Sequence, residues 1–416
     1  MERSSIIIIG AGVAGMAAAR ILSEKFEVTI LEATDRVGGR CLTIQGDGFS
    51  EPVEGGAEFM HGLPRHTLEL LQEASLEYEK VENRFMRIEN GNRVDAQPMD
   101  PHWDEMLQQM KSVIADATLE KFLNENFPGD EFEGLRRHAV SFAEGFDLAD
   151  PKTASIKSLY REWMNEEEQY RINGGYGALT EWMHNDCISR GVNIMLNQVV
   201  RLIEWNFNEV TLTTESDQIF KAQRCLITVP VRMLCAKQMQ FNPTIEEYID
   251  LLTDIGVGSV IKILIEFNEK FWKEDTGFML SDNTIPTWWT QQPRSSNILT
   301  GWLGGPQAER LSAEDDDTLL SKAFESLSNI FDLPAEKIRE NVRAAKVFNW
   351  QKFPFARGGY SFSTTHTSEA RGLLNNPMRN TLYFAGEGIS AGDAPGTVEA
   401  ALASAIEQCE KILTAQ

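Results

Sequence analysis

Three glycines and one carboxylate near the start of the chain are spaced for nucleotide chemistry. Gly10, Gly12 and Gly15 fit the pattern GxGxxG, and Glu32 follows at the distance expected for an acid at the end of the next strand. Such glycines permit a tight turn and a close backbone approach to a pyrophosphate, although they also occur in ordinary turns. A carboxylate accepts hydrogen bonds from a ribose diol and repels an added 2′-phosphate. The pattern therefore predicts an adenine dinucleotide other than NADP.

Two further glycine-rich stretches carry charged side chains. In DRVGGR, Arg36 and Arg40 flank Gly39 and would offer positive charge to a pyrophosphate; a plain basic turn is an equally good interpretation. In EGGAEFMHG, a glycine pair precedes Glu58 and His61. Taken alone, this second stretch is most simply a turn with a surface histidine.

A lysine and several aromatic residues stand out in the second half of the chain. Lys262 lies among aliphatic residues in VIKILIEF, where a lysine usually snorkels or protects a sheet edge. Trp350 and Tyr360 bracket the stretch WQKFPFARGGY. In FAGE, Gly386 brings the backbone close to a cofactor and Glu387 offers a carboxylate to sugar-like hydroxyl groups.

Strands and helices must position these residues. Apolar runs at residues 6–9 and 28–31 flank a helical pattern at 14–22, which predicts a strand, helix, strand unit. A second unit closes the chain, with a strand at 382–385, the glycine-rich GEGISAGDAPG and a small-residue helix at 397–413. These units predict an α/β fold.

The middle of the chain is expected to add helices and further strands. Residues 68–171 read as a mostly helical insertion, with amphipathic segments at 67–77, 102–124 and 134–143. The pattern then predicts a helix at 178–189 and strands at 193–205, 209–214, 224–229 and 260–267.

Composition and charge narrow the class of protein. The chain has 416 residues, enough for two or three domains, and a net charge of −23. This acidity disfavours nucleic acid and anionic membranes as partners and mildly favours a cationic substrate. The five cysteines form no CxxC pair, so neither a disulfide framework nor a metal site is expected. The first strand leaves no room for a signal peptide and no apolar run approaches about 18 residues, so we expect a cytoplasmic protein.

Together these stretches resemble the flavin-containing amine oxidases, the group of monoamine oxidases, polyamine oxidases and lysine-specific histone demethylases. The resemblance spans the chain, but residues 76–165 and 268–345 match poorly, as expected where substrate specificity is built. The matching segments are IIIIGAGVAGMAAA with Glu32, DRVGGR, EGGAEFMHG, EQYRINGGYGAL, the strand around Lys262, Trp350 to Tyr360, and LYFAGEGISAGDAPGTVEAALASA.

The resemblance implies bound FAD and two interleaved domains. A doubly wound, Rossmann-type FAD-binding domain would comprise residues 1–70, 171–253 and 354–416, and an α+β substrate domain would comprise 71–170 and 254–353. Glu387 would contact the ribityl chain, and the helix at Thr397 would direct its free amides at the flavin. The implied FAD-binding residues are Gly10, Gly12, Gly15, Glu32, Gly39, Arg40, Gly56, Ala57, Val199, Gly386, Glu387, Thr397 and Val398.

The resemblance also implies a reaction. Lys262 matches the lysine that holds a water near flavin N5, and Trp350, Tyr360 and Thr397 complete the implied catalytic group. Hydride equivalents would pass from the carbon beside a neutral primary or secondary amine to the flavin; water would hydrolyse the imine, and O2 would yield H2O2. Whether O2 is the physiological acceptor stays open.

Two departures from monoamine oxidases bear on cofactor and substrate. Tyr360 follows the glycine pair where those enzymes have the cysteine that links FAD, so we expect FAD to be non-covalent. Their pair of cage tyrosines is replaced by Ser361 and Thr397; Thr397 and His61 instead match polyamine oxidases and demethylases.

The substrate class is expected to be an amine, including polyamines. Amino acid oxidases of this superfamily place an arginine where this chain reads GAEFMH, and here Glu58 would repel a carboxylate and attract a second ammonium group. His61 and Tyr360 would contact the amine. Arg65 and Arg84 keep an L-amino acid oxidase open as an alternative, as are another FAD-dependent oxidase or desaturase and a degenerate flavoprotein acting as an interaction module. The oligomeric state is not predicted.

Overall fold

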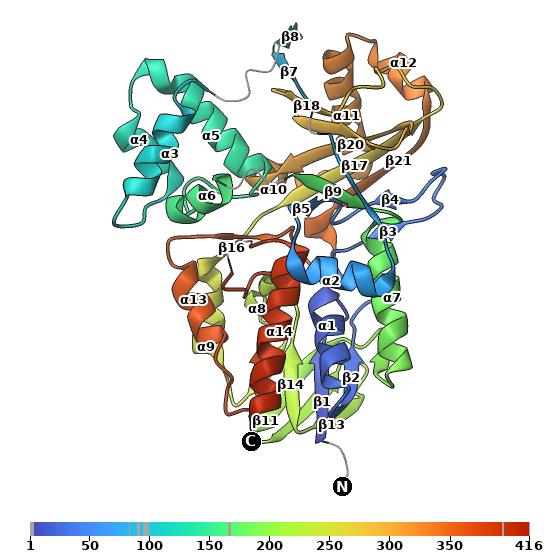
Figure 1. Ribbon diagram of the computed structural model, residues 1–416, viewed down its shortest axis with the longest axis vertical. Coiled ribbons are helices and arrows are strands. Elements are labelled where there is room, and N and C mark those ends of the chain that lie inside the picture. The colour runs from blue at the N-terminus through green and yellow to red at the C-terminus, as the bar shows by residue number, and fades with distance from the viewer. Residues whose placement is uncertain are drawn as a thin grey trace.

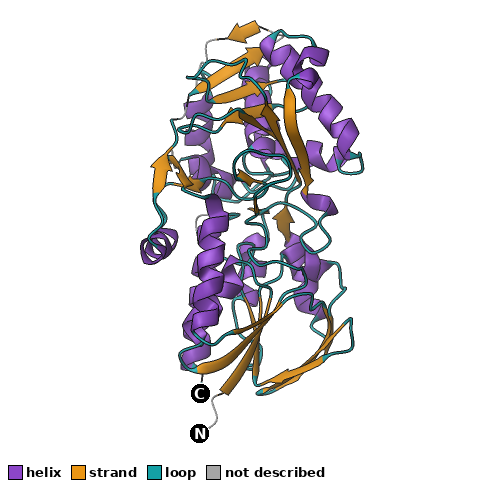
Figure 2. Ribbon diagram, turned by 90° about the vertical axis from the view of Figure 1, so that its right-hand side faces the viewer, coloured by secondary structure: helices purple, strands orange, loops and turns teal. Residues whose placement is uncertain are grey.

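The computed structural model describes residues 4–82, 84–89, 92–94, 100–164, 168–392 and 395–415. Asp393 and Ala394 of the predicted GEGISAGDAPG segment lie outside these residues. Figure 1 shows an elongated molecule with one sheet in its lower half and a larger sheet in its upper half, next to a separate group of helices. In the side view, loops occupy the level between the two sheets (Figure 2).

The lower half contains a parallel five-stranded sheet. It consists, from one edge to the other, of β10 (Asn193–Met195), β2 (Phe26–Leu31), β1 (Ser4–Ile9), β14 (Arg224–Ile227) and β23 (Leu382–Phe384). Ile8 in the central strand pairs with Ile30 on one side and Leu226 on the other. Because these strands come from three distant parts of the chain, the sheet joins both sequence-predicted glycine units.

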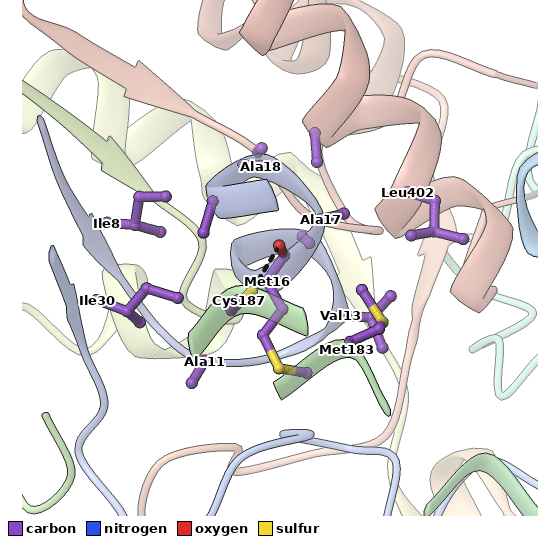
Figure 3. Packing of buried hydrophobic residues seen from close by; sticks show 14 of the residues in the cluster. Ile8, Ala11, Val13, Met16, Ala17, Ala18, Ile30, Met183, Cys187 and Leu402 are labelled. Carbon is purple, nitrogen blue, oxygen red and sulfur yellow. Dashed lines mark hydrogen bonds between the residues drawn. The ribbon is translucent and has the colours of Figure 1, made fainter. Parts of the chain in front are cut away.

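Three helices cover one face of this sheet: α1 (Val13–Leu22), α7 (Gly175–Ser189) and α14 (Val398–Thr414). Figure 3 shows Met16 of α1 close to Cys187 of α7, whose thiol donates to the Met16 carbonyl at 3.5 Å. Leu402 of α14 and Ile8 of the sheet belong to the same buried cluster. The small side chains of α1 therefore let two helices and the sheet pack closely around it.

The other face of the sheet is also covered. Ile7 and Ile9 point to the opposite side from Ile8 and join a second buried cluster. A four-stranded sheet contributes to this cluster, together with short helices. These elements are β13 (Ile219–Ala222), β12 (Glu209–Thr214), β11 (Val200–Asn206), β15 (Gln240–Asn242), α8 (Val231–Cys235), α9 (Glu246–Leu251), η2 (Leu252–Asp254) and α13 (Thr367–Leu374).

The upper half contains a mixed seven-stranded sheet. In spatial order its strands are β21 (Val342–Asn349), β17 (Val260–Phe267), β20 (Ile298–Gly304), β19 (Thr287–Thr290), β18 (Phe278–Ser281), β7 (Phe85–Glu89) and β8 (Asn92–Val94). Strand β17 pairs with β21 and β20 and is buried along its whole length. Lys262 therefore does not lie at a sheet edge. Helices α10 (Gly305–Leu311), α11 (Asp316–Phe331) and α12 (Ala335–Glu340) follow in this half.

The helical group beside the upper sheet forms its own buried cluster (Figure 1). Trp103 and Trp163 stack there with ring centroids 5.2 Å apart. The elements are α3 (Trp103–Ser112), α4 (Leu119–Asn126), η1 (Asp130–Phe132), α5 (Glu133–Gly145) and α6 (Ile156–Trp163).

Short elements lie between the two halves. Glu399 of α14 accepts hydrogen bonds from the backbone amides of His66 and Thr67, at 2.9 Å each, and so caps the first turn of α2. The remaining elements are α2 (Arg65–Ala74), β3 (Thr43–Ile44), β4 (Val53–Glu54), β5 (Met60–His61), β6 (Tyr78–Lys80), β9 (Gln169–Ile172), β16 (Ile255–Val257), η3 (Trp350–Lys352) and β22 (Ser361–Ser363).

The predicted α/β fold with a Rossmann-type domain is confirmed, but three predicted elements differ. The predicted helix at 102–124 is two helices, because Thr118 starts a new one by accepting from the Lys121 amide. The predicted strand at 193–205 is interrupted at Asn197, which has a φ of 58°. The mostly helical region also contains β6, β7 and β8, whose partners are distant strands. The domain boundaries themselves stay a prediction.

Candidate active site

A cavity of about 1990 Å³ brings the separate motifs together. Its walls include the glycine turn after β1, the end of β2, the start of α14 and strand β17. Of the predicted site residues, only Gly15 is absent from its lining. The lining residues are Gly10, Gly12, Glu32, Gly39, Arg40, Gly56, Ala57, Glu58, His61, Val199, Lys262, Trp350, Tyr360, Gly386, Glu387, Thr397 and Val398.

The glycine turn has the shape that a nucleotide requires. Gly10 has a φ of +105°, and a Cβ at Gly15 would lie 2.0 Å from the Gly10 carbonyl, so Gly15 acts by allowing α1 to pack onto the turn. A Cβ at Gly12 would meet no atom within 4 Å and lines the cavity. No side chain caps the first turn of α1. These are the features of a phosphate-binding helix start.

Glu32 lies at the end of β2, as predicted. Its carboxylate accepts from the Ala11 amide at 2.7 Å and from the amide and hydroxyl of Thr34 at 2.9 and 2.8 Å. Those bonds fix the carboxylate at the cavity wall. Its contact with a ribose stays a prediction.

The two arginines of DRVGGR have different roles. Arg36 donates to the carbonyls of Gly39 at 2.6 Å and Val37 at 3.1 Å, so it holds the loop, as the basic-turn interpretation expects. Arg40 instead pairs with Glu387 at 2.7 Å and donates to the Gly359 carbonyl at 2.6 Å. Arg40 thereby joins the first glycine unit to the last one.

Glu387 is held by the protein as well as lining the cavity. One carboxylate oxygen contacts Arg40, and the other accepts from the Ser361 hydroxyl at 2.6 Å. Burial alone would raise the pKa of Glu387, but Arg40 and Ser361 outweigh burial and the pKa is lowered. The predicted ribityl contact therefore involves a carboxylate that is ionised and fixed in place.

The start of α14 faces the same cavity. The Thr397 hydroxyl accepts from the Ala400 amide at 3.1 Å and caps the helix, and Val398 begins it. Gly386 has a φ of +141°, and a Cβ there would meet no atom within 4 Å. This end of the cavity therefore combines a helix N-terminus with exposed backbone, which suits an electron-rich group.

Lys262 belongs to a buried charge cluster. Its side chain is 1% exposed, and its ammonium lies 2.5 Å from a Glu58 oxygen and 3.1 Å from the Gly56 carbonyl. Glu58 also accepts from Arg171 and, at 2.9 Å, from the Trp289 indole. Burial alone would raise the pKa of Glu58, but the two cations outweigh it and lower the pKa to about 2. Two cations already neutralise this carboxylate, so its predicted role in binding a substrate ammonium is not favoured by these contacts.

Aromatic residues form the wall near Tyr360. Its ring stacks on Trp302 with centroids 6.5 Å apart, and its hydroxyl donates to the Phe146 carbonyl. His61 meets the Phe146 ring edge to face at 5.6 Å, and burial lowers the pKa of His61 to about 4, so the imidazole is neutral near pH 7. Trp350 lies deeper and donates to the Gly55 carbonyl at 3.0 Å.

Two carboxyl groups in the cavity wall carry no sequence motif. Asp147 and Glu162 both line the cavity; Asp147 accepts from the Trp163 indole at 2.8 Å and Glu162 from the Ser158 hydroxyl at 2.9 Å. Burial, and then the charge of Glu162, raise the pKa of Asp147 well above its usual value, and burial also raises the pKa of Glu162. Sequence reasoning missed both, because Asp147 and Glu162 belong to the poorly matching segment. An acid between apolar residues in GFDLAD was the available signal.

The comparisons with known proteins agree with this arrangement. The sequence model for the family described as "Flavin containing amine oxidoreductase" matches residues 13–413. The chain belongs to this family. Membership implies a flavin cofactor, and the glycine turn, the open Cβ positions and the start of α14 provide a cavity that fits one.

Curated relatives fall into two groups. The chain is 26% identical over 445 residues to lysine-specific histone demethylase 1B of Mus musculus, which covers 99% of this chain and 53% of that protein. It is 27% identical over 463 residues to polyamine oxidase 4 of Oryza sativa subsp. japonica, covering 99% of this chain and 90% of that one. The chain thus spans about half the length of the demethylase.

Solved structures show the same fold. Putrescine oxidase bound to putrescine matches with a TM-score of 0.84 at 18% identity, covering 99% of both chains. Cyclohexylamine oxidase from Brevibacterium oxydans IH-35A matches with a TM-score of 0.80 at 21% identity, covering 99% of this chain and 100% of that one.

Two searches for other kinds of site returned nothing within the part of the chain that the structure describes. No group of three or more His, Cys, Asp or Glu residues there is arranged to hold a metal ion. No described helix is long and apolar enough to cross a membrane.

Proposed function

We propose that the protein is an FAD-dependent oxidase of primary or secondary amines, with preference for amines that carry a second ammonium group. The carboxyl pair of Asp147 and Glu162 carries this proposal, because it supplies negative charge in the cavity wall near the Tyr360 ring. Polyamine oxidases among the relatives support it. Within the proposal, O2 is the electron acceptor, H2O2 is a product, FAD is held without a covalent bond and the protein is cytoplasmic.

The residues of the cavity divide the work. Bound FAD supplies the acceptor for two electrons from the carbon beside the amine nitrogen. Tyr360 and Trp302 confine the reacting amine, and neutral His61 offers a hydrogen bond without repelling a cation. Ammonium binding would favour the ionised form of Asp147 and Glu162. The product imine is hydrolysed by water to a carbonyl compound.

The substrate class is tested by a peroxide assay on a matched panel. Putrescine and spermidine are compared with butylamine, benzylamine, an N-methyl-lysine peptide and free L-amino acids at about pH 7 to 9.5, because the reactive amine is the unprotonated form of a group with pKa about 10. We expect the highest kcat/KM for a diamine or polyamine. Faster turnover of an L-amino acid than of every amine would overturn the assignment.

The carboxyl pair is tested by Asp147→Asn and Glu162→Gln. Each variant should lower kcat/KM for putrescine at least about tenfold, equal to about 1.4 kcal/mol, and change that for butylamine less than about twofold. Asp150→Asn is the control, because Asp150 lies three residues away and does not line the cavity. Equal losses for the diamine and the monoamine would show that the pair does not recognise the second ammonium.

A further inference from the structure

Lys262 is held by a carboxylate rather than extended toward water. It lies on β17 in the interior of the seven-stranded sheet, and its ammonium reaches the cavity wall between Glu58 and the Gly56 carbonyl. Glu54 also acts on it electrostatically, and the Trp289 ring centroid lies 5.8 Å from the ammonium. Its nearest ionic partner is Glu58, at 2.5 Å.

Glu58 is itself fixed from two further segments. Arg171 of β9 and the indole of Trp289 in β19 both donate to its Oε1 oxygen, whereas Lys262 contacts Oε2. Arg171 is anchored in turn by the carbonyls of Gln292 at 3.0 Å and Thr290 at 3.2 Å. Glu58 therefore has a single orientation, and the position of the Lys262 ammonium follows from it.

The charge balance of this cluster is sensitive to Glu58. Lys262, Arg171 and Glu58 are all nearly inaccessible to solvent, with side chains 1 to 4% exposed. Removing the carboxylate would leave two buried cations without their shared partner, which is costly in a low-dielectric environment. Removing Lys262 would leave Glu58 and Arg171 paired.

We propose that Glu58 is a positioning residue for Lys262: its carboxylate fixes the Lys262 ammonium at the cavity wall and balances its charge, so that Lys262 acts on the bound flavin only with Glu58 in place. The proposal rests on the flavin part of the proposed function and is independent of the amine substrate. Glu58 is thereby assigned to the protein's own charge cluster, not to substrate binding.

The experiment is a double-mutant cycle on the flavin-loaded protein, with Glu58→Gln, Lys262→Met and the double variant. The flavin is reduced with dithionite and reoxidised by O2 in a stopped-flow instrument, and its reduction potential is measured by dye equilibration. Both measurements avoid the substrate. Glu266→Gln is the control, because Glu266 is a buried carboxylate on the same strand that accepts from Ser50 and does not line the cavity.

Glu58→Gln should slow reoxidation at least about fivefold, in the same direction as Lys262→Met, and should add less than about twofold in the Lys262→Met background. The potentials should move in opposite directions, up for Glu58→Gln and down for Lys262→Met, because one change removes an anion and the other a cation. A tenfold change in the reduction equilibrium corresponds to about 30 mV for two electrons. The double variant loses one charge of each sign and should return toward the wild-type potential.

Three results would overturn the proposal: a wild-type reoxidation rate for Glu58→Gln, effects that multiply in the double variant, or potentials that shift in the same direction. If Glu58→Gln does not fold, Glu58→Asp replaces it; the shorter side chain keeps its charge and should slow reoxidation without moving the potential. A wild-type protein that binds no flavin would contradict the proposed function itself, and the absorbance spectrum shows this before any variant is compared.

Discussion

Glu54 and Glu58 lie four residues apart, and their pKa values shift in opposite directions. Glu58 has two cations against it, which outweigh burial and lower its pKa to about 2. Glu54 accepts from the Thr43 hydroxyl at 2.9 Å and the Tyr176 amide at 2.7 Å, and burial raises its pKa to about 7 despite the attraction of Lys262. Direct contact with a cation, and not position in the sequence, decides which carboxyl group is ionised.

The pKa of Glu54 makes stability depend on pH. Its pKa in the folded protein, about 7, lies above the ordinary value of 4.5, so the stability that it contributes is complete below pH 4.5 and is lost as pH rises through 7. Glu54→Gln keeps an acceptor for Thr43 and removes the ionisation. Relative to wild type, the variant should therefore gain up to about 3 kcal/mol between pH 5 and pH 8.

Thermal unfolding of both proteins at the two pH values measures this gain. Glu27→Gln, which changes an exposed carboxylate in β2, is the control and should show none. A difference between variant and wild type that is the same at pH 5 and pH 8 would mean that Glu54 is ionised in the folded protein throughout this range.

At the scale of elements, the start of α1 depends on two glycines for different reasons. At Gly15 a Cβ would lie 2.0 Å from the Gly10 carbonyl, so the helix would have to move away from β1. At Gly12 the φ is −71°, which any residue adopts, and a Cβ would only enter the cavity. The first glycine serves packing and the second serves the cofactor.

The variants Gly12→Ala and Gly15→Ala separate these roles. Gly12→Ala should bind FAD at least about tenfold more weakly while its melting temperature without FAD stays within about 2 °C of wild type. Gly15→Ala should lower both the affinity and that melting temperature, because overpacking typically costs about 1 to 3 kcal/mol. Flavin fluorescence titration and calorimetry of the FAD-free proteins are the measurements. Wild-type affinity in Gly12→Ala would contradict the predicted path of the nucleotide.

At the scale of the whole molecule, the cavity joins two sheets whose strands are interleaved in the sequence. The parallel sheet takes strands from residues 4–31, 193–227 and 382–384, and the seven-stranded sheet takes strands from residues 85–94 and 260–349. Arg40 and Glu387 link two of these regions across 347 positions. A cofactor in the cavity would therefore contact segments from both sheets and should stabilise the protein as one unit.

Non-covalent binding of that cofactor is a prediction about the whole cavity. Tyr360 replaces the linking cysteine, and the only cysteine among the described lining residues is Cys41, whose pKa burial raises to about 12. A thiol in that state is a poor nucleophile. Precipitation with acid should release all of the flavin into the supernatant, as measured by absorbance. Flavin that stays with the washed pellet would show a covalent bond.

The sequence by itself determined the nucleotide-binding unit and the positions of its main contacts. Gly10, Gly12 and Glu32 were found because a short strand, a tight turn and a helix start are local structures, specified by residues that are adjacent in the chain. The same holds for strand β17 and for helix α14 behind Thr397. Their predicted residues line one cavity because the α/β fold brings strand ends and helix starts to the same edge.

Only the tertiary structure decided what the charged side chains contact. Glu58 looked free to bind an ammonium group, but Arg171 and Lys262, 113 and 204 positions further along the chain, lie against it in the fold. Asp147 and Glu162 carried no motif, since their raised pKa values come from burial that no local pattern encodes. The strength of a charge in a protein depends on its distance from other charges and from water, and long-range packing sets both distances.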